Sequence, residues 1–165
     1  HQGPARVFVS EDDAIAAIKS EGTERIIPGE IIVLVCRGPL GAGMPETSQI
    51  TMALKYTKAL KNIALLTDGR LSGASGKVLA AIHVVPETAA GGAIGKLRDG
   101  DRVRIDAQAG SIEVDLSAAE LNARPPAGPG REEAAHGMGR ELFHVFRAQA
   151  SGSESGATVL RGLGD

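Results

Sequence analysis

The sequence predicts an α/β domain built on a mixed, barrel-like sheet that is flanked by helices. Two apolar segments, residues 31–36 and 62–68, are each followed by a glycine-rich loop, and a helical pattern separates them. Strand, loop, helix and strand in this order form a βαβ unit, so the two strands are expected to lie parallel in one sheet. Residues 99–116 instead alternate between polar and apolar side chains, which is typical of a hairpin with one wet face.

The elements of the first half follow from local patterns. Residues 6–9 form a short apolar run, and Ser10 with Asp13 resembles a capping box ahead of a helical stripe over residues 14–18. The continuously apolar and β-branched run at 31–36 indicates a strand buried on both faces. A Gly/Pro loop follows, and residues 50–60 are predicted to be helical.

The second half changes in character. Residues 82–87 are predicted to form a short strand, and a turn at 108–110 closes the hairpin. Ser117 and Glu120 have the spacing of a capping box for a short helix. After a Pro/Gly-rich linker, a final amphipathic helix is expected, with apolar residues near one side: Leu142, Phe143, Val145 and Phe146.

Composition excludes several classes of protein. The chain has 165 residues, 42% of them hydrophobic, which suits one domain with a real core. A net charge of −2 and four aromatic residues exclude a nucleic-acid partner. The single cysteine excludes an internal disulfide and a self-contained iron–sulfur site. No long apolar run or leader is present, so we expect a cytoplasmic protein with no membrane partner.

The loop at residues 67–78 reads TDGRLSGASGKV and invites comparison with a phosphate-binding loop. That motif requires Gly, four residues, and then Gly-Lys followed by Ser or Thr. Here Leu71 occupies the position of the first glycine, and Val78 follows Lys77. The nucleotide hypothesis therefore fails at two positions. What remains is a Gly/Ser loop at the carboxyl end of a buried strand, where α/β sheets tend to bind ligands.

A second loop, residues 38–46, also follows the carboxyl end of a buried strand. If the two strands are parallel, both loops open on the same edge of the sheet, and several polar side chains can converge there: Glu46, Asp68, Arg70, Ser72, Ser75 and Lys77. The alternative is that both loops are only turns, with Asp68 and Arg70 as a solvated pair.

Other reactive side chains have simpler interpretations. His83 lies in the apolar context AAIHVV, which favours a hydrogen-bonded core histidine over a ligand, and no two histidines have metal-binding spacing. Cys36 lies at the end of an apolar strand and is expected to be a small buried hydrophobe.

Several motifs, in order along residues 3–124, resemble the C-terminal domain of the dihydroxy-acid/6-phosphogluconate dehydratase family. They are GAGMPE, TDGRLSGASGKV, AAIHVVPE and GGAIGKLRDGDRVRID. The second and third are closer to the 6-phosphogluconate dehydratase branch than to the branched-chain amino-acid branch. The run CRGPLGAGMPETSQIT is instead similar to aldonate dehydratases.

The resemblance implies removal of water from a 2,3-dihydroxy sugar acid, as in Entner–Doudoroff metabolism, to give a 2-keto-3-deoxy acid. It implies an iron–sulfur cluster and Mg²⁺ as cofactors, with the cluster ligands in an N-terminal domain absent from this chain. Residues 3–124 would form a swivelling β/β/α domain that closes over the cluster, and residues 125–165 a linker, C-terminal helix and flexible tail. The full-length enzyme is expected to be a homo-oligomer, a dimer or tetramer, and the isolated domain to be inactive.

Transferred residue by residue, the resemblance assigns Glu46 as a Mg²⁺ ligand and Ser72 as the base that takes the C2 proton. A serine hydroxyl is a weak acid, so a nearby cation must stabilise its alkoxide. Arg70, Ser75 and Lys77 are expected to contact substrate oxygens. Cys36 matches no cluster position.

Two alternatives remain open. One is a dihydroxy-acid dehydratase of branched-chain amino-acid synthesis, which performs the same chemistry on a smaller substrate. The other is a non-enzymatic small-molecule binding module with the same fold.

Overall fold

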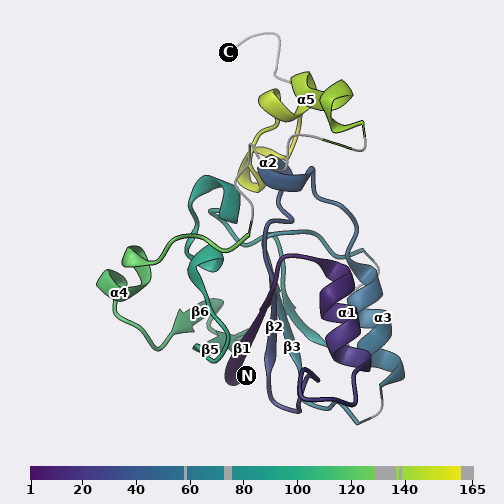
Figure 1. The fold of residues 1–165 in the computed structure, drawn as a ribbon. Coiled ribbons are helices and arrows are strands. Elements are labelled where there is room, and N and C mark those ends of the chain that lie inside the picture. Colours follow the sequence, from purple (N-terminus) through teal and green to yellow (C-terminus); the bar gives the residue numbers. More distant parts are fainter. Residues whose placement is uncertain (58, 73–75, 129–136, 138, 161–165) are drawn as a thin grey trace.

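A computed structural model describes residues 1–57, 59–72, 76–128, 137 and 139–160. In this part of the chain, one six-stranded sheet has the order β4-β3-β2-β1-β5-β6. Its strands are β1 (Gln2–Phe8), β2 (Ile31–Leu34), β3 (Ala64–Thr67), β4 (Leu79–Ala81), β5 (Arg102–Asp106) and β6 (Ser111–Val114). The helices are α1 (Glu11–Lys19), α2 (Pro39–Ala42), α3 (Ser48–Tyr56), α4 (Ala118–Ala123) and α5 (His144–Gln149) (Figure 1).

The sheet is mixed, as the sequence predicts. Strands β1 to β4 are parallel, and Ile31 of β2 lies between Ala5 of β1 and Ala64 of β3. Strand β5 pairs antiparallel with both β1 and β6, which confirms the predicted hairpin. The strand predicted at 82–87 is wrong, because β4 lies just before that segment, at Leu79–Ala81.

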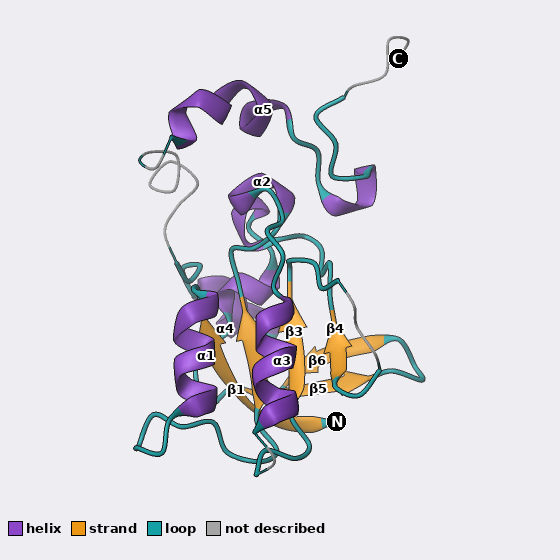
Figure 2. Cartoon of the chain, turned by 90° about the vertical axis from the view of Figure 1, so that its right-hand side faces the viewer, coloured by secondary structure: helices purple, strands orange, loops and turns teal. Residues whose placement is uncertain are grey.

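Helices α1 and α3 lie side by side on one face of the sheet (Figure 2). Each presents a narrow stripe of small and aliphatic residues to the strands, and the cluster beneath them is fully or nearly fully buried. It includes Ala14 and Ile18 of α1, Ile50 and Leu54 of α3, and Leu65 of β3. Removal of this aliphatic surface from water is the main stabilising contribution on this face.

The opposite face is concave. Leu79 of β4 and Ile105 of β5 line the same cavity of about 320 Å³, although three strands separate β4 from β5 in the sheet. The sheet must therefore curl into a half-barrel. Its inner face packs Val33 and Leu66 against Val103 and Ile105, together with Ile94 and Leu97 from the segment that follows β4.

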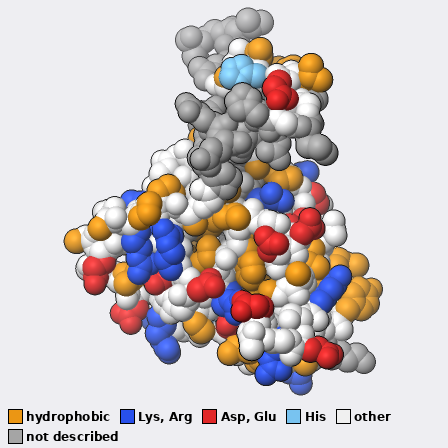
Figure 3. Space-filling view, in the orientation of Figure 1, with side chains coloured by type: hydrophobic (Ala, Val, Ile, Leu, Met, Phe, Trp, Pro, Cys, Tyr) orange, Lys and Arg blue, Asp and Glu red, His pale blue; other side chains and the backbone are white. Residues whose placement is uncertain are grey.

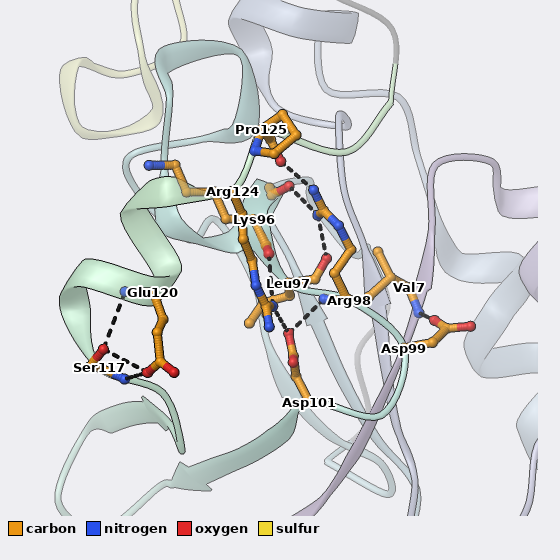
Figure 4. Close-up of polar contacts among 11 residues, drawn as sticks. Val7, Lys96, Leu97, Arg98, Asp99, Asp101, Ser117, Glu120, Arg124 and Pro125 are labelled. Carbon is orange, nitrogen blue, oxygen red and sulfur yellow. Dashed lines mark hydrogen bonds and ion pairs between the residues drawn. The ribbon is translucent and has the colours of Figure 1, made fainter.

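Caps predicted from the sequence define two helix starts. The Ser10 hydroxyl accepts a hydrogen bond from the Asp13 amide at 3.4 Å, and acidic residues fill the first turn of α1, where the helix dipole favours them. At α4 the reciprocal capping box of Ser117 and Glu120 is complete. Figure 4 shows this box and the link from α4 to the body, where the guanidinium of Arg124 binds Asp101.

The C-terminal segment lies beyond the end of the sheet that carries α2 (Figures 1 and 2). The predicted amphipathic helix begins as a 3₁₀ turn at Arg140–Phe143 and continues as α5. Its apolar side chains Leu142, Val145 and Phe146 are 81%, 61% and 55% exposed, and apolar side chains of this segment are open to view in Figure 3. The predicted flexible tail contains a 3₁₀ turn at Ser153–Ser155. No helix in the described residues is long and apolar enough to cross a membrane.

A buried carboxylate joins the loops at the carboxyl edge of the sheet. Asp68 follows β3 directly and is 0% exposed. Its two oxygens accept backbone hydrogen bonds from Arg37 (2.8 Å) and Cys36 (3.2 Å) in the loop after β2, and from Thr88 (2.9 Å) in the segment after β4. A buried carboxylate needs such donors to offset its loss of hydration. One side chain thus fixes the exits of three neighbouring strands.

We predict that Asp68→Ala destabilises the chain by at least about 3 kcal/mol, because three buried or partly buried N–H groups lose their acceptor and each costs about 1–3 kcal/mol. Urea unfolding followed by circular dichroism measures the effect. Asp12→Ala, an exposed carboxylate in the first turn of α1, is the control and should cost less than about 1 kcal/mol. Equal losses in the two variants would contradict the role assigned to Asp68.

Candidate functional site

The loops that follow β2, β3 and β4 meet at the carboxyl edge of the parallel strands, as the sequence predicts for the first two. Three non-glycine residues in these loops have left-handed backbone conformations: Cys36 (φ 62°), Met44 (φ 55°) and His83 (φ 55°). Such conformations are unfavourable for residues with a Cβ and are frequent at functional sites. The strained loop positions therefore gather where a ligand site was expected.

Residues 44–47 lie beside residues 70–72. Glu46 and Arg70 form an isolated parallel β-bridge. The Arg70 Nε donates to the Met44 carbonyl at 2.8 Å, and the Thr47 hydroxyl donates to the Arg70 carbonyl at 2.6 Å. Thr47 is fully buried, so the second bond satisfies its hydroxyl away from water. Backbone and side-chain contacts together hold the two loops in register.

Within this contact the Glu46 carboxylate meets the backbone of Ser72. The Ser72 amide donates to Oε1 of Glu46 at 2.9 Å, and the Thr47 amide donates to the same oxygen at 3.1 Å. The Ser72 amide, with Arg70 nearby, lowers the pKa of Glu46. The predicted proximity of Glu46, Arg70 and Ser72 is confirmed, and the carboxyl is held in its charged form.

On the other side of the same segment lies His83. Its backbone amide donates to the Gly69 carbonyl at 2.9 Å, and the Val84 amide donates to the Thr67 carbonyl at 3.1 Å. The expected core position of His83 is wrong, because its side chain is exposed. The left-handed backbone conformation breaks the extended pattern that the apolar neighbours suggested, and nothing in the sequence signals that change.

Three residues at the exit of β3 shape the loop, namely Thr67, Asp68 and Gly69. The Thr67 hydroxyl accepts from the Gly69 amide at 3.0 Å, and Asp68 binds neighbouring backbone groups, so the predicted solvated pair of Asp68 and Arg70 is wrong. Gly69 permits a close approach, since a Cβ there would lie 2.7 Å from the Cβ of Arg37.

Lys77 lies away from Ser72. It comes two residues before β4, whose first residue pairs with Ala64 at the amino end of β3, whereas Ser72 follows the carboxyl end of β3. Together with Lys55 and Lys61, Lys77 lines a cavity of about 620 Å³ beside α3, which Leu71 lines as well but Ser72 does not. The third expected substrate contact, Ser75, lies outside the described residues.

Arg37 is a site residue that the sequence analysis missed. Its backbone is fixed by the hydrogen bond from its amide to Asp68, and its Cβ lies directly against Gly69. The Nε atom is buried and has no hydrogen-bond partner among the residues that the structure describes, which leaves a charged donor unsatisfied there. Its place directly after a buried strand was a signal that could have identified it.

The described residues can supply one ligand for Mg²⁺, but they do not fit an iron–sulfur cluster. Oε1 of Glu46 accepts both hydrogen bonds, and the charged carboxylate offers the hard oxygen that Mg²⁺ prefers. In the described residues no three His, Cys, Asp or Glu side chains form a complete metal site, so Glu46 can be only one ligand of several. An iron–sulfur cluster does not fit, because Cys36 is the chain's one cysteine, and burial and Asp68 raise its pKa to about 11.

Comparison with known proteins identifies relatives along nearly the whole chain. Residues 1–157 match the family described as dihydroxy-acid/6-phosphogluconate dehydratase, C-terminal. The phosphogluconate dehydratase of Zymomonas mobilis is 45% identical over 162 residues, covering 96% of this chain, and that of Escherichia coli K12 is 42% identical over 161 residues. A D-xylonate dehydratase of Escherichia coli is 50% identical over 105 residues, which cover 64% of this chain and 15% of that protein.

The chain spans about a quarter of the length of the phosphogluconate dehydratases, since the matches cover 26% of each. A dihydroxy-acid dehydratase of Sulfurisphaera tokodaii is 43% identical over 125 residues, 75% of this chain and 22% of that protein. All these relatives are named as dehydratases.

We predict that the Cys36 thiol is nearly inert in the folded chain. With its pKa raised to about 11, roughly a thousandth of it is thiolate at pH 8, against about a quarter for an ordinary cysteine. Alkylation by iodoacetamide at pH 8 should therefore be about 200-fold slower in buffer than in 8 M urea. Because Cys36 is the one cysteine in the chain, no other thiol contributes to the alkylation that is measured. Equal rates in the two solvents would contradict the raised pKa of Cys36.

Proposed function

Since this chain belongs to the dihydroxy-acid/6-phosphogluconate dehydratase family and matches its C-terminal domain, we propose that it forms part of the active site of a sugar-acid dehydratase. The reaction removes water from a 2,3-dihydroxy acid and gives a 2-keto-3-deoxy acid. The remaining part of the site is proposed to come from an N-terminal domain, against which this domain swivels.

The hydrogen bond from the Ser72 amide to Glu46 at 2.9 Å carries this proposal. It unites the residue proposed as the base with the residue proposed as a metal ligand, although 26 positions separate them in the sequence. The bond also restrains the Cα of Ser72, because this atom is bonded directly to the amide nitrogen. The side chain of Ser72 extends from the same Cα. A base must be held within hydrogen-bond reach of the proton that it removes.

In the proposed mechanism, the Ser72 oxygen takes the proton from C2 of the substrate. The electron pair of that C–H bond forms the C2–C3 double bond, and the hydroxyl at C3 leaves. The resulting enol then takes the keto form. When bound, Mg²⁺ would be held in part by Glu46 and would supply the positive charge that stabilises the Ser72 alkoxide and holds the carboxylate and C2 oxygen of the substrate. Glu46 remains a carboxylate throughout, because two backbone amides stabilise its charge.

The substrate is proposed to be a sugar acid, either 6-phosphogluconate or a related aldonate. Relatives that match nearly the whole chain are phosphogluconate dehydratases, which favours this class over the smaller substrate of branched-chain synthesis. Such substrates are anions, and Arg37 and Arg70, whose positive charges act on Cys36 and Glu46 respectively, lie on the loops at this edge of the sheet. The iron–sulfur cluster is proposed to be held by residues outside this chain. The homo-oligomeric state and the cytoplasmic location remain predictions.

We predict that Ser72→Ala in the full-length enzyme lowers kcat by at least about 100-fold, because the proton at C2 loses its acceptor. The backbone amide that binds Glu46 is unchanged, so thermal stability and the visible spectrum of a bound cluster should be unchanged. Ser20→Ala, at the amino edge of the sheet, is the matched control and should retain full activity. Turnover of Ser72→Ala near the wild-type rate would remove Ser72 as the base.

We predict that Glu46→Gln weakens Mg²⁺ binding by at least about 10-fold, because a neutral amide oxygen replaces a charged ligand. The amide oxygen can still accept from Ser72, so the loop geometry should persist. Mg²⁺ titration of the full-length enzyme, read by activity and by calorimetry, measures the change. The exposed Glu24→Gln is the control. Identical Mg²⁺ affinity in Glu46→Gln and wild type would exclude Glu46 as a ligand.

A further inference from the structure

We propose that the cavity of about 620 Å³ beside α3 binds a phosphorylated organic anion. Neither Glu46 nor Ser72 lines this cavity, so the inference goes beyond the proposed function and assigns a further binding site to the chain. The cavity lies between α3, the segment that precedes β3 and the segment that enters β4. Its volume is within the range of about 300–1,000 Å³ that is typical of small-molecule sites.

The inner wall of the cavity is apolar and well packed. It is formed by Leu54 of α3, Ile63 ahead of β3 and Leu71 after β3. These three side chains are only 6–8% exposed, because they belong to the core cluster beneath α1 and α3. Met52 of α3 is 49% exposed and adds apolar surface that a ligand can cover. Since the inner wall is part of the folded core, the cavity is formed before any ligand binds.

Three lysines line the same cavity, and none of the other described residues that line it is acidic. Lys55 lies on α3, Lys61 between α3 and β3, and Lys77 two residues before β4, and all three are exposed. In the part of the chain that the structure describes, each ion pair joins a carboxylate to an arginine, so these ammonium groups have no counter-charge there. A concave surface with charges of one sign concentrates its electric field and attracts ligands of the opposite sign.

The positive charge is a property of a long stretch of the sequence. Although the chain has a net charge of −2, Asp68 is the one acidic residue between positions 47 and 86. Its carboxylate is buried and accepts three backbone hydrogen bonds at the carboxyl edge of the sheet. Three of the six lysines in the chain line the cavity. A surface that only keeps a protein soluble usually mixes both signs of charge, so this concentration of lysines favours a ligand site.

The chemistry of the walls indicates which anion fits. A phosphate ester carries about 1.5–2 negative charges at pH 7, so it pairs with several ammonium groups better than a single carboxylate does. The apolar inner wall suits the carbon skeleton of such a molecule. Thr51 and Asn62, which also line the cavity, can form hydrogen bonds with its polar substituents. The cavity therefore fits a small organic phosphate, whereas a flat acidic protein surface would not fill it.

The cavity adjoins both loops that carry the proposed site residues. Leu71 in its wall directly precedes Ser72, and α3, which forms another wall, begins two residues after Glu46. A ligand in the cavity would therefore contact the two segments that the bond between Glu46 and Ser72 joins. The phosphate can belong to the substrate or to a separate molecule, and the two sources require different tests.

Binding is tested on this chain with phenyl phosphate, and phenol is the neutral counterpart. We expect saturable shifts of the Leu71 and Val78 amides in NMR spectra, with a Kd below about 5 mM, and no such shifts with phenol. Lys61→Gln and Lys77→Gln should each weaken binding at least about fivefold, because each removes one of three positive charges. Lys19→Gln, at an exposed lysine at the end of α1, is the matched control and should bind as the wild type does.

Three results would overturn the proposal. They are equal affinity for phenol and phenyl phosphate, unchanged affinity in both variants of the cavity, and a loss in Lys19→Gln as large as theirs. Because each substitution replaces an exposed side chain, the variants should keep the wild-type pattern of amide signals elsewhere in the spectrum.

Kinetics of the full-length enzyme separate the two sources of the phosphate, and this step alone rests on the proposed function. If the substrate supplies it, Lys61→Gln should raise KM at least about 10-fold for a phosphorylated sugar acid and leave KM for the unphosphorylated acid unchanged. If a separate molecule supplies it, phenyl phosphate should change the turnover of the wild type without competing with substrate, and Lys61→Gln should remove this effect. An equal increase in KM for both substrates would contradict recognition of phosphate.

Failure of this inference is distinguishable from failure of the proposed function, because binding to the chain is measured without turnover. An inactive Ser72→Ala beside a chain that does not bind phenyl phosphate would remove only the cavity site. Saturable binding beside a Ser72→Ala enzyme with full turnover would remove only the proposed mechanism.

Discussion

The arrangement of the carboxyl edge depends on the buried carboxylate of Asp68. Its oxygens accept backbone hydrogen bonds from Cys36, Arg37 and Thr88, so the exits of β2 and β4 are fixed relative to β3. A second acidic residue, Glu87, is 3% exposed and accepts from the amides of Leu40 and Gly41 at the start of α2. Acidic side chains thus serve as acceptors for loop backbone that has no strand partner.

The apolar faces of the sheet and the polar contacts between its loops have different roles. The carboxyl edge can therefore hold both rigid strand ends and strained backbone conformations. The aliphatic clusters on the two faces of the sheet stabilise the fold without any polar contribution. Their stability supports left-handed conformations at Cys36, Met44 and His83, which local interactions alone would not favour. The polar side chains Glu46 and Ser72 are then positioned by backbone contacts between loops rather than by helices or strands.

Much of the scaffold was predictable because its signals are local. Continuous β-branched sequence identified β2, alternation identified β5 and β6, and residue spacing identified the Ser117–Glu120 cap. Strand β4 was misplaced because Leu79–Ala81 is short and rich in alanine, whereas the apolar run that follows it does not pair as a strand. Sequence motifs also do not show that the chain after Ser72 returns to the amino edge, and this return separates Lys77 from Ser72.

The side chains of the site also show that local sequence patterns predict only part of the structure. Glu46 and Ser72 were predicted by resemblance, and the parallel strands indicated that they would meet. The exposure of the neighbouring His83 was missed because it follows from one backbone torsion angle, which its apolar neighbours conceal. Arg37 was missed because its importance lies in a close approach to Gly69 and in an unsatisfied Nε. These are properties of packing between distant segments, and no pattern within one segment encodes them.

The curl of the sheet has a consequence for self-association. An open sheet has two edges that can recruit strands from other molecules and initiate fibrils. Here the curl brings Ala107 and Gln108, at the β5–β6 turn, to the same cavity as Leu79, at the start of the edge strand β4. The other edge, β6, has four residues and includes the exposed Glu113. Short, charged and partly covered edges disfavour strand addition, so the half-barrel gains much of the protection against aggregation that a closed barrel has.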